Sequence, residues 1–228
     1  MRMRKKKNGA SRLSACAHLL CQQPEAPISS AAESFHRDGE IHLEVGCGKG
    51  GFACGMAKAN PDINFYAMER VHDVMMLAAE RAEREKEERP DNLRFILAGA
   101  ADLAAYFAPG SLSCIYLNFS DPWPKKGYAK RRLTHRNFLR LYFSLLREGG
   151  ELRMKTDNTG LFDFTLEEMA ALGLTPYFVT RDFHATPEAD GNIMTEYETN
   201  FSSQGIPICS LRVQKRGELA PEKPTNES

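Results

Sequence analysis

The feature that most constrains the fold is a short strand candidate followed directly by a glycine-rich loop. The candidate is Ile41–Val45, and Gly46, Gly48 and Gly51 follow it in the spacing G-x-G-x-x-G. Residues 52–60 then have a helical pattern that ends at a proline. A strand, a glycine turn and a helix in this order predict an α/β fold with a nucleotide-like ligand at the turn.

The rest of the chain continues this alternation of apolar strands and helical segments. Further strands are predicted at 63–68, 93–97, 112–117, 152–156, 176–180 and 208–213. Helices are predicted at 71–89, 102–107 and 160–172, and another begins at Thr134 and stops at Gly149-Gly150. A long polar loop is expected before the last strand. This pattern predicts a mostly parallel seven-stranded sheet with helices on both faces.

Acidic and amide side chains follow several of the predicted strands. Glu69, Asn118 with Asp121, and Asp157 stand at strand ends, and Glu44 lies at the end of the first strand beside the glycines. Ligands of parallel α/β sheets bind outside the carboxyl ends of the strands. The sequence therefore predicts an active site at this edge of the sheet.

The residues around the glycine loop favour one of two cofactor classes. The spacing between Gly46 and Glu69 suits a carboxylate that binds ribose hydroxyls. NAD enzymes and S-adenosylmethionine enzymes share this feature. Glu44 stands two residues before the glycines, where it would repel a pyrophosphate but attract the cationic amino group of a methionine moiety. The pattern favours S-adenosylmethionine over NAD.

Charge is balanced over the chain but concentrated locally. The 30 Lys and Arg and the 30 Asp and Glu cancel, which excludes a globally basic nucleic-acid protein. Residues 122–147 nevertheless hold eight Lys or Arg and no Asp or Glu, and five of the first seven residues are basic. The stretch 118–132 joins a polar strand end, Trp123 and the start of this basic run. We expect RNA phosphates to bind here, with an affinity that falls with salt.

Several motifs in this order resemble those of the bacterial tRNA (guanine-N7-)-methyltransferases. The glycine motif is generic, whereas Asp-Pro-Trp-Pro-Lys and Thr-Glu-Tyr-Glu are specific to the family. The matching segments are Leu-Glu-Val-Gly-Cys-Gly-Lys-Gly (43–50), Asn-Phe-Ser-Asp-Pro-Trp-Pro-Lys-Lys (118–126), Lys-Arg-Arg (130–132), Lys-Thr-Asp-Asn (155–158) and Gly-Asn-Ile-Met-Thr-Glu-Tyr-Glu (191–198).

The resemblance implies a Rossmann-like class I methyltransferase fold that methylates N7 of a guanosine in the tRNA variable loop. It places Asp121 as the catalytic residue. It assigns S-adenosylmethionine to Glu44, Gly46, Gly48, Glu69, Gly99, Ala100, Asn118 and Asp121. It assigns the substrate to Lys125, Asp157, Thr195, Glu196, Tyr197 and Glu198, and further RNA contacts to Lys126, Gly127, Lys130, Arg131 and Arg132. The family commonly has an acid where this chain has Gly99, so a backbone carbonyl or Asp102 is expected to accept from the adenine amino group.

The chemistry of guanine suggests a role for each substrate residue. N7 has a lone pair and no proton, so no general base is needed, and alignment supplies most of the catalysis. Asp121 would favour the positive charge that develops on the ring. Asp157 or Glu198 would accept from guanine N1 and N2, and Lys125 would donate to O6.

Alternative functions and roles remain open from the sequence. The nearest rival function is S-adenosylmethionine-dependent methylation of an exocyclic amine of a nucleic-acid base, since Asn-x-x-Asp-Pro-Trp resembles the motif of amino-group methyltransferases. A NAD oxidoreductase and a non-catalytic RNA-binding module are the other rivals. Trp123 either stacks on a base or anchors its loop to the core.

The two ends of the sequence, its cysteines and its apolar runs give further predictions. Residues 1–40 are predicted to be a basic arm and linker, 41–215 the methyltransferase domain, and 216–228 a disordered tail. Six cysteines without a CxxC pair indicate reduced thiols and no metal site. No run of about 20 apolar residues is present, so we expect a cytoplasmic protein with no membrane contact. The sequence leaves open whether it is a monomer or a homodimer.

Overall fold

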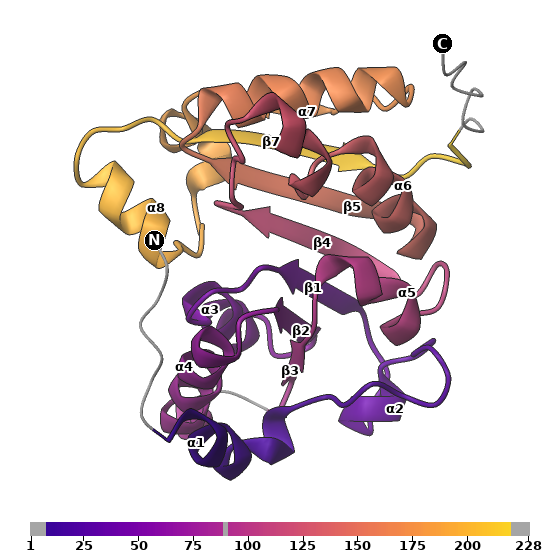
Figure 1. The fold of residues 1–228 in the computed structure, drawn as a ribbon, viewed down its shortest axis with the longest axis vertical. Coiled ribbons are helices and arrows are strands. Elements are labelled where there is room, and N and C mark those ends of the chain that lie inside the picture. The colour runs from indigo at the N-terminus through magenta and orange to yellow at the C-terminus, as the bar shows by residue number, and fades with distance from the viewer. Residues whose placement is uncertain (1–7, 89–90, 220–228) are drawn as a thin grey trace.

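The computed structural model describes residues 8–88 and 91–219 and contains one seven-stranded sheet in the order β3-β2-β1-β4-β5-β7-β6 (Figure 1). All neighbouring strands are parallel except β7, which is antiparallel to both β5 and β6. The predicted α/β class and mostly parallel sheet are confirmed. The strands are β1 (Ile41–Val45), β2 (Asn64–Glu69), β3 (Leu93–Leu97), β4 (Leu112–Asn118), β5 (Leu146–Thr156), β6 (Phe178–Thr180) and β7 (Cys209–Gln214).

Helices cover both faces of the sheet (Figure 1). One face carries α1 (Gly9–Ala15), α3 (Gly51–Ala59) and α4 (His72–Arg84). The other carries α2 (Ala32–Phe35), α5 (Leu103–Tyr106), α6 (Arg136–Leu145) and α7 (Thr159–Ala171). A further helix, α8 (Glu196–Ser202), lies beyond the carboxyl end of β4. Short 3-10 turns are η1 (Ala17–Leu19), η2 (Lys86–Glu88), η3 (Ala100–Asp102), η4 (Lys126–Arg131), η5 (Phe183–Ala185) and η6 (Pro187–Ala189).

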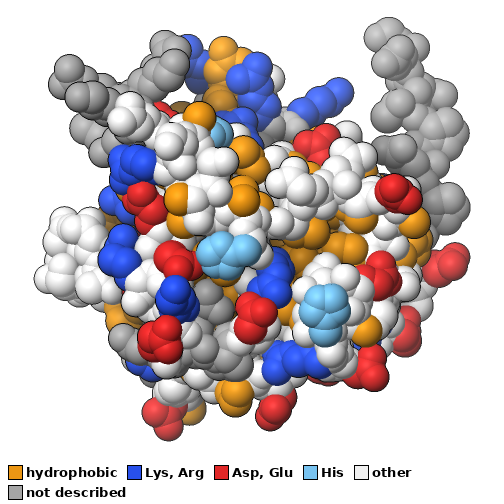
Figure 2. Space-filling view, turned by 90° about the horizontal axis from the view of Figure 1, so that it is seen from below, with side chains coloured by type: hydrophobic (Ala, Val, Ile, Leu, Met, Phe, Trp, Pro, Cys, Tyr) orange, Lys and Arg blue, Asp and Glu red, His pale blue; other side chains and the backbone are white. Residues whose placement is uncertain are grey.

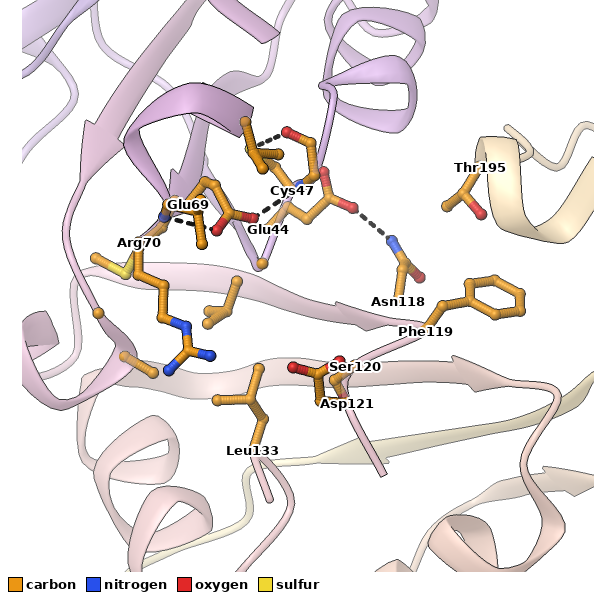
Figure 3. A pocket seen from close by; sticks show the side chains of 18 of the residues that line it. Glu44, Cys47, Glu69, Arg70, Asn118, Phe119, Ser120, Asp121, Leu133 and Thr195 are labelled. Carbon is orange, nitrogen blue, oxygen red and sulfur yellow. Dashed lines mark hydrogen bonds between the residues drawn. The ribbon is translucent and has the colours of Figure 1, made fainter. Parts of the chain in front are cut away.

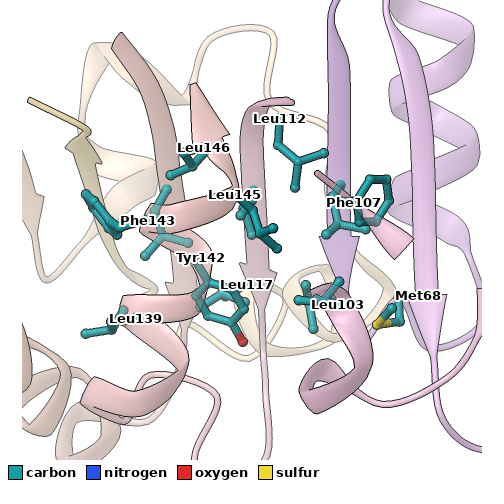
Figure 4. Packing of buried hydrophobic residues seen from close by; sticks show 14 of the residues in the cluster. Met68, Leu103, Phe107, Leu112, Leu117, Leu139, Tyr142, Phe143, Leu145 and Leu146 are labelled. Carbon is teal, nitrogen blue, oxygen red and sulfur yellow. The ribbon is translucent and has the colours of Figure 1, made fainter. Parts of the chain in front are cut away.

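The central strands are buried on both of their faces. Every residue of β1 and of β4 is buried, and this includes the polar side chains of Glu44 and Asn118 at the edge that carries the site. On the α6 side, Leu139, Tyr142 and Leu145 of the helix belong to the same buried apolar cluster as Leu117 of β4 (Figure 4). Burying a Leu side chain of this kind contributes about 2 kcal/mol. These layers hold the carboxyl ends of β1, β2, β4 and β5 in fixed positions.

The helix predicted to run from Thr134 to Gly149-Gly150 is wrong at both ends. His135 is the cap, its Nδ1 accepting from the Asn137 N–H at 3.2 Å. The helix ends at Leu145, and the two glycines lie inside β5, where the pairing with β4 shifts register. A Cβ on Gly150 would lie 2.9 Å from the Arg147 carbonyl oxygen and 3.1 Å from two carbonyl oxygens of β4. The glycine therefore permits close approach of two backbones.

The described part of the predicted arm, residues 8–40, packs against the domain. Leu13 and Leu19 are buried in the same apolar cluster as α4, and Arg12 donates twice to Glu80 of α4 at 2.7 Å. The Cys21 N–H donates to the Phe95 carbonyl at 2.8 Å, which covers part of the outer strand β3. The surface seen from this end has acidic and basic side chains interspersed (Figure 2). Residues 1–7 of the arm and 220–228 of the predicted tail lie outside the described residues.

The loop expected before the last strand contains a helix that the sequence analysis missed. Residues 196–202 form α8, and the capping box of Thr195 and Glu198 was its sequence signal.

None of the helices within 8–88 and 91–219 combines the length and apolarity that a bilayer span requires.

Candidate active site

A cavity of about 1160 Å³ opens at the carboxyl edge of the sheet, where the sequence predicted the active site. Its walls come from β1 and the glycine loop, the end of β2, residues 98–101, the tip 118–121, the basic segment and α8. Figure 3 shows Glu44, Glu69, Asn118 and Asp121 around it. Segments distant in sequence thus contribute to one pocket.

Glu44 is the most unusual group in the pocket. It is only 2% exposed; one carboxylate oxygen, Oε1, accepts from Asn118 Nδ2 at 2.9 Å, and the other, Oε2, has no hydrogen-bond partner (Figure 3). Burial raises the pKa of Glu44 to about 8, against the opposing effects of Asn118 and Lys155. A buried carboxyl with an unpaired oxygen fits a ligand that brings a cationic donor.

The glycine loop and Glu69 form the part of the pocket wall next to Glu44. Gly46 and Gly48 have φ values of 84° and 56°, which favour glycine, and nothing lies within 4 Å of a Cβ built on Gly48. The Glu69 carboxylate accepts from the Gly48 N–H at 3.3 Å and from the Val71 N–H at 2.9 Å. Two backbone donors therefore fix this carboxylate at the position expected to bind ribose.

The end of the pocket at Gly99 has no carboxylate in its wall. The wall there consists of Ala98, Gly99, Ala100 and Ala101. The Asp102 carboxylate, one of two expected adenine acceptors, accepts from the Gly99 N–H at 3.1 Å and caps η3. Both acceptors predicted for the adenine amino group, a backbone carbonyl and the Asp102 carboxylate, therefore lie at this end of the pocket or next to it.

The tip after β4 is held in a strained backbone conformation. Phe119 and Trp123 have φ values of 50° and 41°, which cost of the order of 1–3 kcal/mol each for residues with a side chain. The Phe119 N–H donates to the Lys155 carbonyl at 2.9 Å. This tip places Asp121, which is exposed, in the pocket wall, and Arg70 points into the same pocket (Figure 3).

The basic segment divides into residues in the pocket wall and residues outside it. Lys130 and Arg131 line the pocket, whereas Lys125, Lys126 and Gly127 are exposed beyond it. Arg132 is half-buried. It donates to the Trp123 carbonyl at 3.1 Å, and its guanidinium lies 4.3 Å from the centre of the Phe164 ring. These contacts connect it to the turn and to α7.

Trp123 packs within this loop and also reaches the pocket. Its ring meets the Tyr128 ring edge-to-face at 5.8 Å, and the Arg131 guanidinium lies 5.2 Å from its centre. These contacts hold the ring within its own loop, beside the pocket that Trp123 also lines.

Three residues of the Thr-Glu-Tyr-Glu motif lie in the pocket wall, and the fourth is buried outside it. Thr195, Glu196 and Tyr197 line the pocket, and Tyr197 is 61% exposed. Glu198 is fully buried; its carboxylate accepts from Lys155 Nζ at 2.5 Å and from Asn192 Nδ2 at 2.7 Å. The expected hydrogen bond from guanine to Glu198 does not fit this burial. Asp157 lies at the end of β5, outside the pocket wall.

Lys155 is a residue that the sequence analysis did not assign. It is 8% exposed, and burial lowers its pKa while the adjacent Glu198 opposes that shift. A lysine near the end of an apolar strand was the available signal, because charged side chains are rarely buried without a partner.

The fold and this site define a class I methyltransferase: a Rossmann-like sheet with an acidic cofactor pocket at its carboxyl edge. Residues 38–211 match the family model Methyltransf_4, described as "Putative methyltransferase". The chain belongs to this methyltransferase family, which confirms the family that its motifs resemble. S-adenosylmethionine is accordingly the cofactor, and the unpaired Glu44 oxygen and open glycine loop fit it.

Solved methyltransferases share the fold at low sequence identity. A 16S rRNA methyltransferase, KamB, is similar over 83% of this chain and 96% of its own, with a TM-score of 0.61 and 15% identity. The antibiotic-resistance methyltransferase Kmr is similar over 90% and 93%, with a TM-score of 0.55 and 18% identity. Geranyl diphosphate C-methyltransferase from Streptomyces coelicolor A3(2), solved with S-adenosyl-L-homocysteine, is similar over 91% and 76%, with a TM-score of 0.52 and 14% identity.

Proposed function

We propose that the protein transfers a methyl group from S-adenosylmethionine to N7 of a guanosine in the variable loop of tRNA. The observation that carries the proposal is the composition of the pocket wall. The wall contains Glu44 and the glycine loop together with Lys130, Arg131 and Asp121. A cofactor site and an RNA-attracting surface therefore share one cavity.

The cofactor end of the pocket suits the methionine moiety and ribose of S-adenosylmethionine. The Glu44 carboxylate accepts from the cofactor amino group, which gives its unpaired Oε2 a partner. Glu69 binds the ribose hydroxyls, and Gly46 and Gly48 let the ligand approach the backbone. The bound cofactor supplies an electrophilic methyl group on its sulfonium.

The protein's part in the transfer is alignment and charge stabilisation. Guanine N7 needs no proton acceptor, so residues that hold the base in line with the methyl supply most of the rate enhancement. Asp121 stabilises the positive charge that the ring gains. The exposed ring of Tyr197, stacked on Phe119 at 6.3 Å, offers a surface on which an unstacked base can rest.

The exposed cations next to the pocket bind the tRNA backbone. Lys125, Lys126, Lys130 and Arg131 make contacts with phosphates that carry no base specificity. Incubation with labelled S-adenosylmethionine and unmodified tRNA, followed by nucleoside analysis, tests the proposal. We expect N7-methylguanosine as the labelled product; a methylated exocyclic amine would support the rival reaction.

A further inference from the structure

The segment that contains α8 rests on a face of α3 that has no side chains. Gly51 and Gly55 are one helical turn apart and face the same side. A Cβ built on Gly55 would lie 2.6 Å from Ile193 Cγ2, and one built on Gly51 would lie 2.7 Å from Glu196 Oε1. The Gly55 contact is too close for any other residue unless Ile193 moves. At Gly51 the added Cβ would also meet the Arg81 guanidinium, so a side chain there would disturb the contact between Arg81 and Glu196.

Two ion pairs fasten the same segment at its sides. Arg81 of α4 pairs with Glu196, and Lys155 of β5 pairs with the buried Glu198 at 2.5 Å. Lys155 Nζ also donates to the Asn192 side chain at 2.9 Å and to the Ile193 carbonyl at 3.3 Å. Arg81 and Lys155 do not belong to the pocket wall, whereas Glu196 does.

Lys155 also connects this segment to the tip that carries Asp121. Its carbonyl accepts from the Phe119 N–H at 2.9 Å. The Phe119 ring stacks on Tyr197 at 6.3 Å with an interplanar angle of 20°, and on Phe201 at 6.1 Å with an angle of 22°. Helix α8 and the tip are therefore fixed relative to each other by both backbone and side-chain contacts.

We propose that Gly51, Gly55, Arg81 and Lys155 form a seat for α8 that sets where the methyl acceptor binds relative to Asp121. These are positioning residues, since they act through the 192–198 segment and lie outside the pocket wall. The seat determines acceptor binding, while the part of the pocket wall formed by Glu44, Gly46, Gly48 and Glu69 binds the cofactor independently of it. The identity of the acceptor as a tRNA guanosine rests on the proposed function.

Gly55→Ala is the sharpest perturbation of the seat. Alanine is a better helix former than glycine, so the change does not weaken α3 itself. Its methyl group displaces Ile193 and, with it, the start of α8. We expect kcat/KM for tRNA to fall by about 10- to 100-fold, since small misplacements of reacting groups have effects of this size. The Kd for S-adenosylmethionine, measured by calorimetry, should stay within about twofold.

A second substitution separates positioning from general damage. Ile193→Ala removes the Cγ2 atom that the new methyl meets, so Gly55→Ala/Ile193→Ala should recover most of the lost kcat/KM. Ile193→Ala alone is the matched control for the lost isoleucine. A double variant no better than Gly55→Ala, or an equal loss of cofactor affinity in the single variant, would overturn the proposal.

Hydrogen exchange gives a readout that does not depend on the substrate. Gly55→Ala and Arg81→Gln should both accelerate exchange in 196–202 while exchange in 41–51 stays unchanged. Unchanged exchange in α8 for both variants would refute the seat. If the native protein transfers no methyl group to tRNA, the proposed function fails, and the exchange experiment still decides whether the seat exists.

Discussion

If Glu44 accepts from the cofactor amino group as proposed, we expect cofactor binding to be linked to loss of a proton. Its pKa of about 8 means that at pH 7 about nine molecules in ten carry a neutral Glu44 before the cofactor binds. The cationic amino group of S-adenosylmethionine requires the ionised form as its acceptor. Binding at pH 7 should therefore release about 0.9 proton, and the affinity should rise by close to tenfold between pH 6 and pH 7.

Isothermal titration calorimetry in buffers of different ionisation enthalpy measures this proton directly. Glu44→Gln should bind the cofactor more weakly, release no proton and show no such pH dependence. The ligand 5′-methylthioadenosine, which lacks the amino acid moiety, is the matched control and should release no proton from the native protein. If the native protein released no proton with S-adenosylmethionine, or if Glu44→Gln released as much, the assignment of Glu44 to the amino group would be refuted.

Further substitutions test the remaining parts of the account. The pKa of Glu44 in the folded protein exceeds its ordinary value of 4.5, so the folded state binds an extra proton between pH 4.5 and about 8, and the free energy of unfolding falls as pH rises through that window. In chemical denaturation, Glu44→Gln should therefore gain stability relative to the native protein across the window, by no more than about 5 kcal/mol. Asp121→Ala should abolish methyl transfer in a filter assay while tRNA binding is retained; full activity would exclude its catalytic role. Gly99→Asp, at a position where a Cβ meets only the Asp102 carboxylate at 3.6 Å, should tighten S-adenosylmethionine binding several-fold by calorimetry. Lys126→Ala should reduce the slope of log K for tRNA against log salt by about one, whereas an unchanged slope would exclude a phosphate contact.

The sequence was sufficient to predict the sheet and the edge that carries the site. Short, largely apolar runs between turns and helical segments predicted β1 and β3 with their observed bounds. The predicted parallel topology implied that the acids at the strand ends lie at one edge of the sheet, and Glu44, Glu69 and Asp121 do line one pocket. Local patterns sufficed for these features because they depend on burial and chain direction.

Features that depend on contacts between distant segments could not be read from the sequence. Gly150 resembles a helix stop, but its function is to let two strands approach each other. Glu198 belongs to a motif predicted to contact the substrate, yet its carboxylate is buried against Lys155 of β5. Arg132 sits in a basic run, but its partners are the Trp123 carbonyl and the Phe164 ring. In each case the decisive neighbour is remote in sequence.

The most direct test of the central claim is to locate the methyl group within the RNA. Unmodified tRNA, treated with the protein and S-adenosylmethionine, is reduced with borohydride and cleaved with aniline, which cuts the chain at N7-methylguanosine. The account predicts a single cleavage in the variable loop, absent when Asp121→Ala replaces the native protein. Methyl incorporation without cleavage, or cleavage outside the variable loop, would contradict it.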